Sequence, residues 1–325
     1  MNESLVTAIV LNWNGGDEVI GCVEHVFAQS YRLIEIIVVD NASTDGSREA
    51  ICSRFPDLHL IANSVNLGYA TGMNQGIKQA HGEHVLLLNQ DAWIRNDFIE
   101  NAVRTIGNLP ADVGMLAGKV YRLDNLHKTS ELVSGGTLLR RRFQLRADPD
   151  SGSEHFTLGP VYCSPFMRKA MLSDIQAVAG HCFDDRYFAF GEDLDLTLRA
   201  QLRGWKCFFS PSLVTWHAHS SSLGGKVRLW EKPPTIRKHS LRNRYTTILK
   251  DLPCGVMLYL APFLIISEIA AWPFFLAFSP STIVCLVRAY LETLAQLPST
   301  LQLRRVLQHN RVVSNRSLLR FFRGF

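Results

Sequence analysis

The chain has 325 residues, of which 47% are hydrophobic and 19% are charged. These fractions exclude an intrinsically disordered protein, and the length suits one large or two moderate domains. The net charge of +5 is uneven, because residues 293–325 hold six arginines and no Asp or Glu. Such a basic segment predicts an anionic partner, either a nucleic acid or a lipid surface.

The cysteines and the N-terminus predict that the folded part of the chain stays in the cytoplasm. The seven cysteines include no CxxC pair and are odd in number, which indicates neither a disulfide framework nor a zinc ribbon. A reducing compartment is the simpler interpretation. The first residues, MNESLVTAIVLNWN, lack a basic region followed by an apolar run, so we expect no signal peptide.

Apolar segments and turn residues alternate at the start of the chain. Strands are predicted for four apolar segments, residues 6–11, 34–39, 58–62 and 85–88. A helix is predicted from 17 to 29, a second with Asp45 as its N-cap, and a third that opens near Gly68. Strand-helix alternation predicts an α/β fold with a mostly parallel sheet and helices on both faces.

The segment EHVLLLNQDAW places Asp91 just after a strand with no polar residue inside it. In open α/β sheets ligands bind outside the carboxyl ends of the strands, which makes Asp91 a candidate ligand for a metal or a phosphate-side group. The alternative is a cap on a helix that starts near Asn96. This segment alone does not separate the two interpretations.

Other strand ends carry residues that suit a nucleotide pocket. Asp40 can accept the ring N–H of a pyrimidine, and Asn12 and Asn66 can bind ribose or phosphate. Each residue alone is better explained as a turn residue, but several at successive strand ends favour the pocket. The chain has neither G-x-G-x-x-G nor a P-loop motif, so a pyrophosphate would need a cation, which again points to Asp91.

The middle of the chain predicts further short strands. A strand is expected at 113–121, a pair of short strands within 134–145, and a strand at 161–167 before a helix at 168–178. The pair carries three consecutive arginines, Arg140, Arg141 and Arg142. They can contact phosphate, although a solvated edge is the favoured interpretation.

The segment FDDRYFAFGEDLDLTLRAQLR brings Glu192, Asp193 and Asp195 to the start of a predicted helix. Acidic residues suit a helix N-terminus electrostatically, which is one explanation. The aromatic residues before them predict partial desolvation of a carboxylate, which raises its pKa as a general base requires. Further on, His217 ends a strand-like region and is a candidate ligand for a divalent cation, although a lone His is more often an ordinary polar residue.

Four motifs, VVDNASTDGS, NLGYATGMNQG, LNQDAW and FGEDLDLTLR, occur in this order. Together they resemble the inverting family 2 glycosyltransferases of the GT-A fold, especially bacterial rhamnosyltransferases. The resemblance implies a Rossmann-like glycosyltransferase domain at residues 1–250. It also implies transfer of a sugar from a pyrimidine nucleotide-sugar, either dTDP-rhamnose or a UDP-sugar, to a hydroxyl of a lipid-linked or oligosaccharide acceptor in cell-surface polysaccharide synthesis.

The resemblance also implies roles for individual residues. Asp193 matches the catalytic base, and Asp91 with His217 matches the site of a divalent cation, Mg²⁺ or Mn²⁺. Glu192 and Trp216 would lie near the acceptor. The donor would be bound by Asn12, Asp40, Asn41, Asn66, Gly68, Asn74, Asn89 and Asp91. Asn89 stands where the family's DxD motif has its first Asp.

Residues 251–325 are predicted to form a helical region that associates with a membrane. Residues 252–267 and 269–287 are uncharged on either side of Glu268, and the second run contains Pro273 and Pro280. The first run is too short to span a bilayer and the second is broken by prolines, so helices that lie in the membrane interface are favoured over a span. The basic, amphipathic end supports attachment to anionic lipid, and it lacks the folded aromatic groove of a nucleic-acid site.

These observations predict an enzyme attached peripherally to the inner face of the cell membrane, with no nucleic-acid partner. Two other interpretations remain open at this point. A non-catalytic sugar-nucleotide-binding or scaffold protein could have the same fold. A nucleotidyltransferase is the alternative among enzymes, but it would not need the carboxylates at 192–195.

Overall fold

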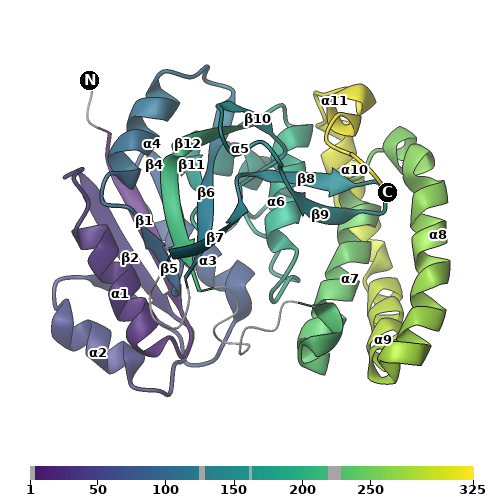
Figure 1. Cartoon of the computed structure of the whole chain (residues 1–325), viewed down its shortest axis with the longest axis horizontal. Coiled ribbons are helices and arrows are strands. Elements are labelled where there is room, and N and C mark those ends of the chain that lie inside the picture. Colours follow the sequence, from purple (N-terminus) through teal and green to yellow (C-terminus); the bar gives the residue numbers. More distant parts are fainter. Residues whose placement is uncertain (1–3, 124–128, 161–162, 219–227) are drawn as a thin grey trace.

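The computed structural model describes residues 4–123, 129–160, 163–218 and 228–325. A large sheet with helices on both sides occupies the left of Figure 1, and helices from the last third of the chain stand to its right. The predicted mostly parallel α/β fold and the C-terminal helical region are therefore confirmed.

The ten-stranded sheet is built around four parallel strands in the order β3-β2-β1-β4. Their bounds are Val6–Asn12 for β1, Ile34–Asp40 for β2, His59–Ala62 for β3 and His84–Asn89 for β4. A short antiparallel strand, β11, then joins β4 to the long parallel pair β6 and β12. The remaining bounds are Phe166–Arg168 for β11, Val113–Leu123 for β6, Lys206–His217 for β12, Ala92–Ile94 for β5, Thr129–Ser134 for β7 and His155–Thr157 for β10.

Helices cover both faces of the sheet because its strands are apolar on both faces. In β1, Ala8 and Val10 belong to one core, while Ile9 between them belongs to the other. The first core includes residues of three helices, α1 (Gly16–Phe27), α2 (Ser47–Arg54) and α4 (Phe98–Gly107). The second includes residues of three others, α3 (Gly68–Gln79), α5 (Lys169–Ala179) and α6 (Glu192–Leu202).

A third core joins the sheet domain to the C-terminal helices. It contains apolar residues of α6 and of a two-stranded hairpin, β8 (Thr137–Arg140) and β9 (Gln144–Ala147). It also contains residues of the C-terminal region, which begins with a short 3-10 helix, Leu229–Glu231. The helices that follow are α7 (Pro234–Asp251), α8 (Cys254–Phe278), α9 (Pro280–Ala295), α10 (Leu297–His309) and α11 (Asn315–Leu319).

The prediction that prolines break the second apolar run is wrong at Pro273, which lies inside α8, and right at Pro280, where α8 has ended and α9 begins. Helix α8 continues for 25 residues with Pro262 and Pro273 inside it. A proline removes one backbone hydrogen bond at a cost of roughly 3 kcal/mol, and the packing of Val256 and Leu260 into the third core offsets it. In the described part of the chain, α8 is the one helix long and apolar enough to cross a membrane by length and composition.

The basic C-terminal end also differs from the prediction. Leu307 is buried, and Leu318, Phe321 and Phe322 pack into the third core, so these apolar side chains are not available to lipid. Large exposed apolar side chains are instead concentrated on α8 and α9. They are Leu258, Tyr259, Ile265, Ile266, Ile269, Phe274, Leu276, Phe278, Val284, Val287, Leu291 and Leu294.

Two smaller predictions also need correction. The N-cap of α2 is Gly46, with φ of +85°, and the preceding Asp45 accepts a hydrogen bond from the backbone N–H of Ser47 at 3.1 Å. The strand expected at 161–167 is assigned only from Phe166, and residues 161–162 lie outside the described part of the chain. Pro165 has no N–H to pair with a neighbouring strand, although its carbonyl still accepts from the N–H of Leu87.

Candidate functional site

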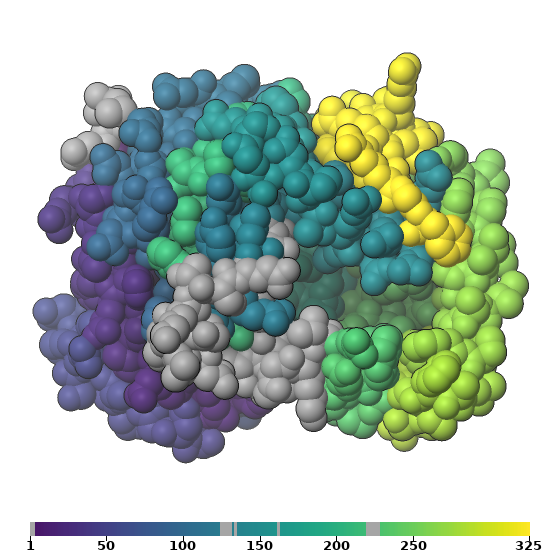
Figure 2. All heavy atoms as spheres, viewed as in Figure 1, coloured from purple at the N-terminus to yellow at the C-terminus, as the bar shows by residue number. Residues whose placement is uncertain are grey.

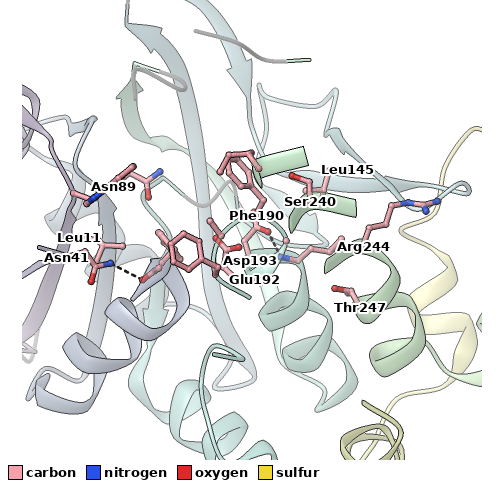
Figure 3. A pocket seen from close by; sticks show the side chains of 18 of the residues that line it. Leu11, Asn41, Asn89, Leu145, Phe190, Glu192, Asp193, Ser240, Arg244 and Thr247 are labelled. Carbon is pink, nitrogen blue, oxygen red and sulfur yellow. Dashed lines mark hydrogen bonds between the residues drawn. The ribbon is translucent and has the colours of Figure 1, made fainter. Parts of the chain in front are cut away.

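A cavity of about 600 Å³ lies between the sheet and the C-terminal helices. Figure 2 shows that this face of the molecule is hollowed between the two parts, and Figure 3 shows the side chains around the cavity. Both Asp91 and Asp193 line it, although 102 positions separate them in the sequence (193 − 91). The strand-end carboxylate and the helix-start carboxylates therefore meet in one site.

The cavity has two ends of different composition. The strand end is formed by Leu11, Asn41, Asn66, Gly68, Asn89, Asp91 and His217. The helix end is formed by Ile236, Ser240, Arg244 and Thr247 of α7 and by Phe143, Gln144 and Leu145 of the β8–β9 hairpin. In Figure 3, Asp193 lies between Asn41 and Asn89 on one side and Ser240 and Arg244 on the other.

The strand end exists because parallel strands bring their carboxyl ends to one edge of the sheet. Asn12 of β1 pairs in register with Asp40 of β2, and Leu11 pairs with Asn89 of β4. Asn41 follows β2 directly and donates from Nδ2 to the carbonyl of Gly68 at 2.9 Å. The alternation of strands and helices in the sequence thus predicted which residues share this edge.

Gly68 joins the strand end to the loop before α6. Its φ is +82°, and a Cβ there would lie 2.4 Å from the backbone oxygen of Phe188. The N–H of the next residue, Tyr69, donates to that same oxygen at 2.7 Å. Only glycine combines this backbone conformation with this close approach.

Three of the predicted donor-binding residues do not line the cavity. Asn12 and Asp40 are fully buried, and Nδ2 of Asn12 donates to Oδ1 of Asp40 at 2.8 Å. Asp40 also accepts from the backbone N–H of Ser43 at 3.1 Å, so this pair holds the strand ends and their turns together. Asn74 bonds both backbone groups of Phe183, which fixes the loop after α5. Their roles in donor binding remain predictions.

Asp91 and His217 form a pair at the strand end. Oδ1 of Asp91 lies 3.0 Å from Nε2 of His217, and Nδ2 of Asn89 lies 3.5 Å from the same nitrogen. The alternative role of Asp91 as a helix cap is wrong, because α4 begins at Phe98 and its N-cap is Asp97. Asp91 precedes the short strand β5, which pairs with the end of β12 and so places His217 beside it.

The donor atoms of this pair suit a divalent cation. A carboxylate oxygen, an imidazole nitrogen and the amide oxygen of Asn89 are ligands that Mn²⁺ accepts. Oδ1 of Asn89 is buried and has no hydrogen-bond partner among the described residues, as expected of a side chain that awaits a ligand. Among the described residues no group of three or more His, Cys, Asp or Glu side chains is arranged to hold a metal ion, so a bound ligand would have to supply further oxygens.

The carboxylates of α6 are presented by a strained turn. Phe190 has a φ of +69° and Gly191 a φ of +95°, and Gly191 is the N-cap of the helix. Nδ2 of Asn243 in α7 donates to the carbonyl oxygens of both Ala189 and Phe190, which holds this turn in place. The turn directs Glu192 and Asp193 into the cavity.

The predicted perturbation of these carboxyl groups is confirmed. Burial raises the pKa of Asp193, and the hydrogen bond from the N–H of Leu194 to its Oδ1, at 2.7 Å, opposes part of that rise. Burial and the nearby Asp193 raise the pKa of Glu192 well above its usual range. Since the environment disfavours charge on Glu192 most strongly, Asp193 is the one of the two that ionises more readily and is then free to accept a proton.

The Glu192→Gln variant is expected to be more stable than the wild type at neutral pH. Folding raises the pKa of Glu192. Above the ordinary glutamate pKa, the unfolded chain therefore releases a proton that the folded protein keeps. The free energy of unfolding falls as the pH rises through this range. The amide does not titrate and avoids this loss. Thermal unfolding should give equal melting temperatures near about pH 4 and a higher value for the variant at pH 7, by about 2 to 4 °C per kcal/mol regained. Equal melting temperatures at both pH values would contradict the shift.

A buried ion cluster lies behind the turn at Phe190 and Gly191. It consists of Asp184, Asp195, Arg199 and Lys250, all at most 2% exposed. Nζ of Lys250 donates to Oδ2 of Asp184 at 2.7 Å and contacts Oδ1 of Asp195. Burial opposes ionisation of Asp195, but Arg199 and Lys250 outweigh it and lower its pKa. The cluster ties α6 and α7 to the loop between α5 and α6.

Some cavity residues had not been predicted. Gln90, between Asn89 and Asp91, accepts from the N–H of Trp13 at 2.7 Å and donates to its carbonyl at 3.2 Å, which clamps the loop after β1. The α7 residues at the helix end were also missed. By contrast Trp216, predicted to lie near the acceptor, is in β12 opposite Trp93 and is not among the cavity-lining residues. Its acceptor role remains a prediction.

Comparisons with known proteins relate the chain to glycosyltransferases. A family model described as glycosyl transferase family 2 matches residues 7–171, about half of the chain. Glycosyltransferase GlyG of Streptococcus pneumoniae is 33% identical over 126 residues, which cover 38% of this chain and 41% of that protein. The match thus spans less than half the length of this relative.

A longer match is found with N-acetylglucosaminyl-diphospho-decaprenol L-rhamnosyltransferase of Mycobacterium tuberculosis, which is 27% identical over 231 residues. That match covers 59% of this chain and 69% of the relative. Among solved structures, a mannosyltransferase from Pyrobaculum calidifontis in complex with GDP-Man and Mn²⁺ has a TM-score of 0.56 at 19% identity. It covers 95% of this chain and 86% of the mannosyltransferase chain, which supports the same fold.

Proposed function

The chain belongs to glycosyltransferase family 2, and we propose that it transfers a sugar, with inversion, from a pyrimidine nucleotide-sugar to a hydroxyl of a lipid-linked glycan. One observation carries this proposal. A single cavity holds a strand-end carboxylate suited to the donor side and, on α6, a carboxylate whose pKa is raised by burial. The similarity to a rhamnosyltransferase favours rhamnose, carried by dTDP, as the sugar.

Asp193 would act as the general base. Its carboxylate would take the proton of the acceptor hydroxyl as that oxygen attacks the anomeric carbon. Attack from the face opposite the leaving diphosphate inverts the configuration in one displacement, so no second carboxylate is needed as a nucleophile. Because burial raises its pKa, Asp193 is a stronger base than an exposed aspartate, and it ionises more readily than Glu192, whose pKa is raised further.

Asp91, His217 and Asn89 would hold a divalent cation beside the donor diphosphate. Such an ion supplies charge stabilisation to the departing diphosphate when it is bound. The side chains themselves orient one another: His217 is held by Asp91 at 3.0 Å, and the carbonyl of Asp91 accepts from the N–H of Ala218 at 3.1 Å. Mn²⁺ in the mannosyltransferase structure supports this assignment.

The donor can be identified by thermal unfolding with UDP-, dTDP- and GDP-sugars, each with Mn²⁺ or with EDTA. A ligand at about a hundred times its dissociation constant adds about 2.7 kcal/mol of stability, which is readily measured. We expect pyrimidine nucleotide-sugars to raise the melting temperature in the presence of Mn²⁺. Stabilisation by GDP-sugars alone would overturn the proposed donor, and stabilisation by no nucleotide-sugar in this set would overturn the proposed reaction.

We also propose that α8 and α9 attach the enzyme to the membrane. Twelve large apolar side chains are exposed on these two helices, a surface far larger than isolated exposed residues produce. Because residues 252–325 contribute Leu252, Val256 and Phe321 to the third core, their deletion would unfold the enzyme as well as remove this surface. Point substitutions therefore test the proposal more cleanly.

The Ile269→Glu variant is expected to bind vesicles of anionic phospholipid at least about tenfold more weakly than the wild type. Ile269 is 67% exposed, so the change adds a charge that must leave water on binding without disturbing the core. Co-sedimentation with vesicles measures the effect. Leu33→Glu, at a position 40% exposed on the sheet domain, is the matched control and should bind as the wild type does. Equal binding by both variants would rule out α8 as the attachment surface.

A further inference from the structure

The helix end of the cavity contains a cation that the proposed reaction does not use. Among the cavity-lining residues that the structure describes, Arg244 is the one arginine or lysine. In Figure 3 it lies on the far side of Asp193 from Asn41 and Asn89. A donor diphosphate beside Asp91 would therefore be separated from Arg244 by the catalytic carboxylates.

Arg244 keeps hydrogen-bonding capacity in this position. Its Nη2 donates to the backbone oxygen of Arg142 at 2.9 Å, and its Nη1 lies 3.5 Å from Oε2 of Glu268. A guanidinium has five N–H groups, and the ion pair is longer than a good charge-assisted hydrogen bond. The side chain is 24% exposed, so a ligand in the cavity can reach it.

Arg244 also lies next to the helix that carries the exposed apolar surface. Glu268 is the one charged residue within α8, and it faces inward, where it accepts hydrogen bonds from Tyr245 of α7 and Tyr290 of α9. Its sequence neighbour Ile269 is exposed. Arg244 of α7 thus contacts α8, the helix that carries much of the exposed apolar surface.

The turn between β8 and β9 also contacts α8. The guanidinium of Arg141 stacks over the ring of Phe263 in α8, 5.3 Å from its centroid. Arg140, Arg141 and Arg142 were expected to form a solvated edge, but Arg141 packs against α8. A molecule anchored in lipid beside α8 would meet cationic side chains before its polar head reached Asp193.

We infer that Arg244 binds the phosphate group through which the proposed acceptor is joined to its lipid. This inference rests on the proposed function, because it assigns the acceptor half of the same cavity. The lipid would lie along α8, the phosphate at Arg244, and the sugar hydroxyl at Asp193. Glu268 pairs with Arg244 when no phosphate is there.

The test uses the full chain and two probes that share a lipid tail, farnesyl diphosphate and the uncharged farnesol. We expect the wild type to bind the diphosphate more tightly, and Arg244→Gln to lose about tenfold in that affinity while binding farnesol unchanged. Arg288→Gln, at an exposed position of α9 outside the cavity, is the matched control and should behave as the wild type. UDP and dTDP should not displace the probe, since they belong at the strand end.

A structural role for Arg244 predicts a different result in Glu268→Gln. If Arg244 merely held α8 in place, loss of its ion-pair partner would weaken binding of the diphosphate. If Arg244 binds the phosphate, its release from Glu268 should instead make binding of the diphosphate tighter. Unchanged affinity in Arg244→Gln, or displacement by UDP or dTDP, would overturn the inference. The binding measurement needs no donor and no turnover, so its failure is distinguishable from failure of the proposed transfer reaction.

Discussion

Asp193→Asn is expected to lower the rate of sugar transfer by about a thousandfold and to leave nucleotide-sugar binding nearly unchanged. General-base catalysis contributes about 10² to 10⁴ in rate, and the amide cannot accept the acceptor's proton. Asp193 is separated from the strand end, where the donor is proposed to bind, so the donor's stabilising effect on thermal unfolding should persist.

The wild-type pH profile should agree with this role. Asp193 must be ionised to accept a proton, so activity is lost as the pH falls through its pKa, and burial places that acid limb above the range of an exposed aspartate. Asp57→Asn, at an exposed position of the sheet domain, is the control and should keep wild-type activity and the same limb. Activity of Asp193→Asn within about tenfold of the wild type would exclude Asp193 as the base.

Lys250→Met is expected to lower the free energy of unfolding by about 3 to 5 kcal/mol, because it removes one partner of a buried ion cluster. Lys250 is fully buried between Asp184 and Asp195, and the variant leaves these two carboxylates with one cation fewer. The melting temperature should fall by about 10 °C. Activity should fall as well, since the cluster fixes α6 against α7.

The same helix offers a matched control for this effect. Lys238 is 25% exposed and pairs with Glu292 at 2.7 Å, so Lys238→Met should cost less than about 1 kcal/mol. Equal destabilisation by the two lysine variants would mean that the buried cluster contributes no more than a surface pair.

The sequence predicted the strand end of the site better than the helix end. Runs such as residues 85–88 are buried on both faces of the sheet, and this burial leaves an uninterrupted apolar signal followed by polar residues. Asn41, Asn89 and Asp91 could therefore be placed at one edge without coordinates. Some strand-end residues face the cavity, whereas others, such as Asp40, bind the turns that follow the strands. Side-chain hydrogen bonds decide between the two, and the periodicity of a sequence does not predict them.

Helix α7 was missed because its buried face is polar. Arg242, Asn243, Lys250 and Asp251 are all buried, but in a sequence such residues indicate a solvated helix. Their partners lie in the loop before α6 and in the C-terminal helices, for example the carbonyl of Arg186, which accepts from Arg242 at 2.7 Å. Charge pairs between distant segments carry no local signal, so this wall of the cavity was not predictable.

The backbone joint at Gly68 has a consequence for protein engineering. One design for altering donor preference would graft the first four strands of one family member onto the remainder of another. Here the graft boundary would run through the contact between Gly68 and the carbonyl of Phe188, which sets the position of the turn that presents Asp193. A chimera that exchanges one side of this contact without the other would have a new donor-binding half, but Asp193 would be displaced from its position in the cavity.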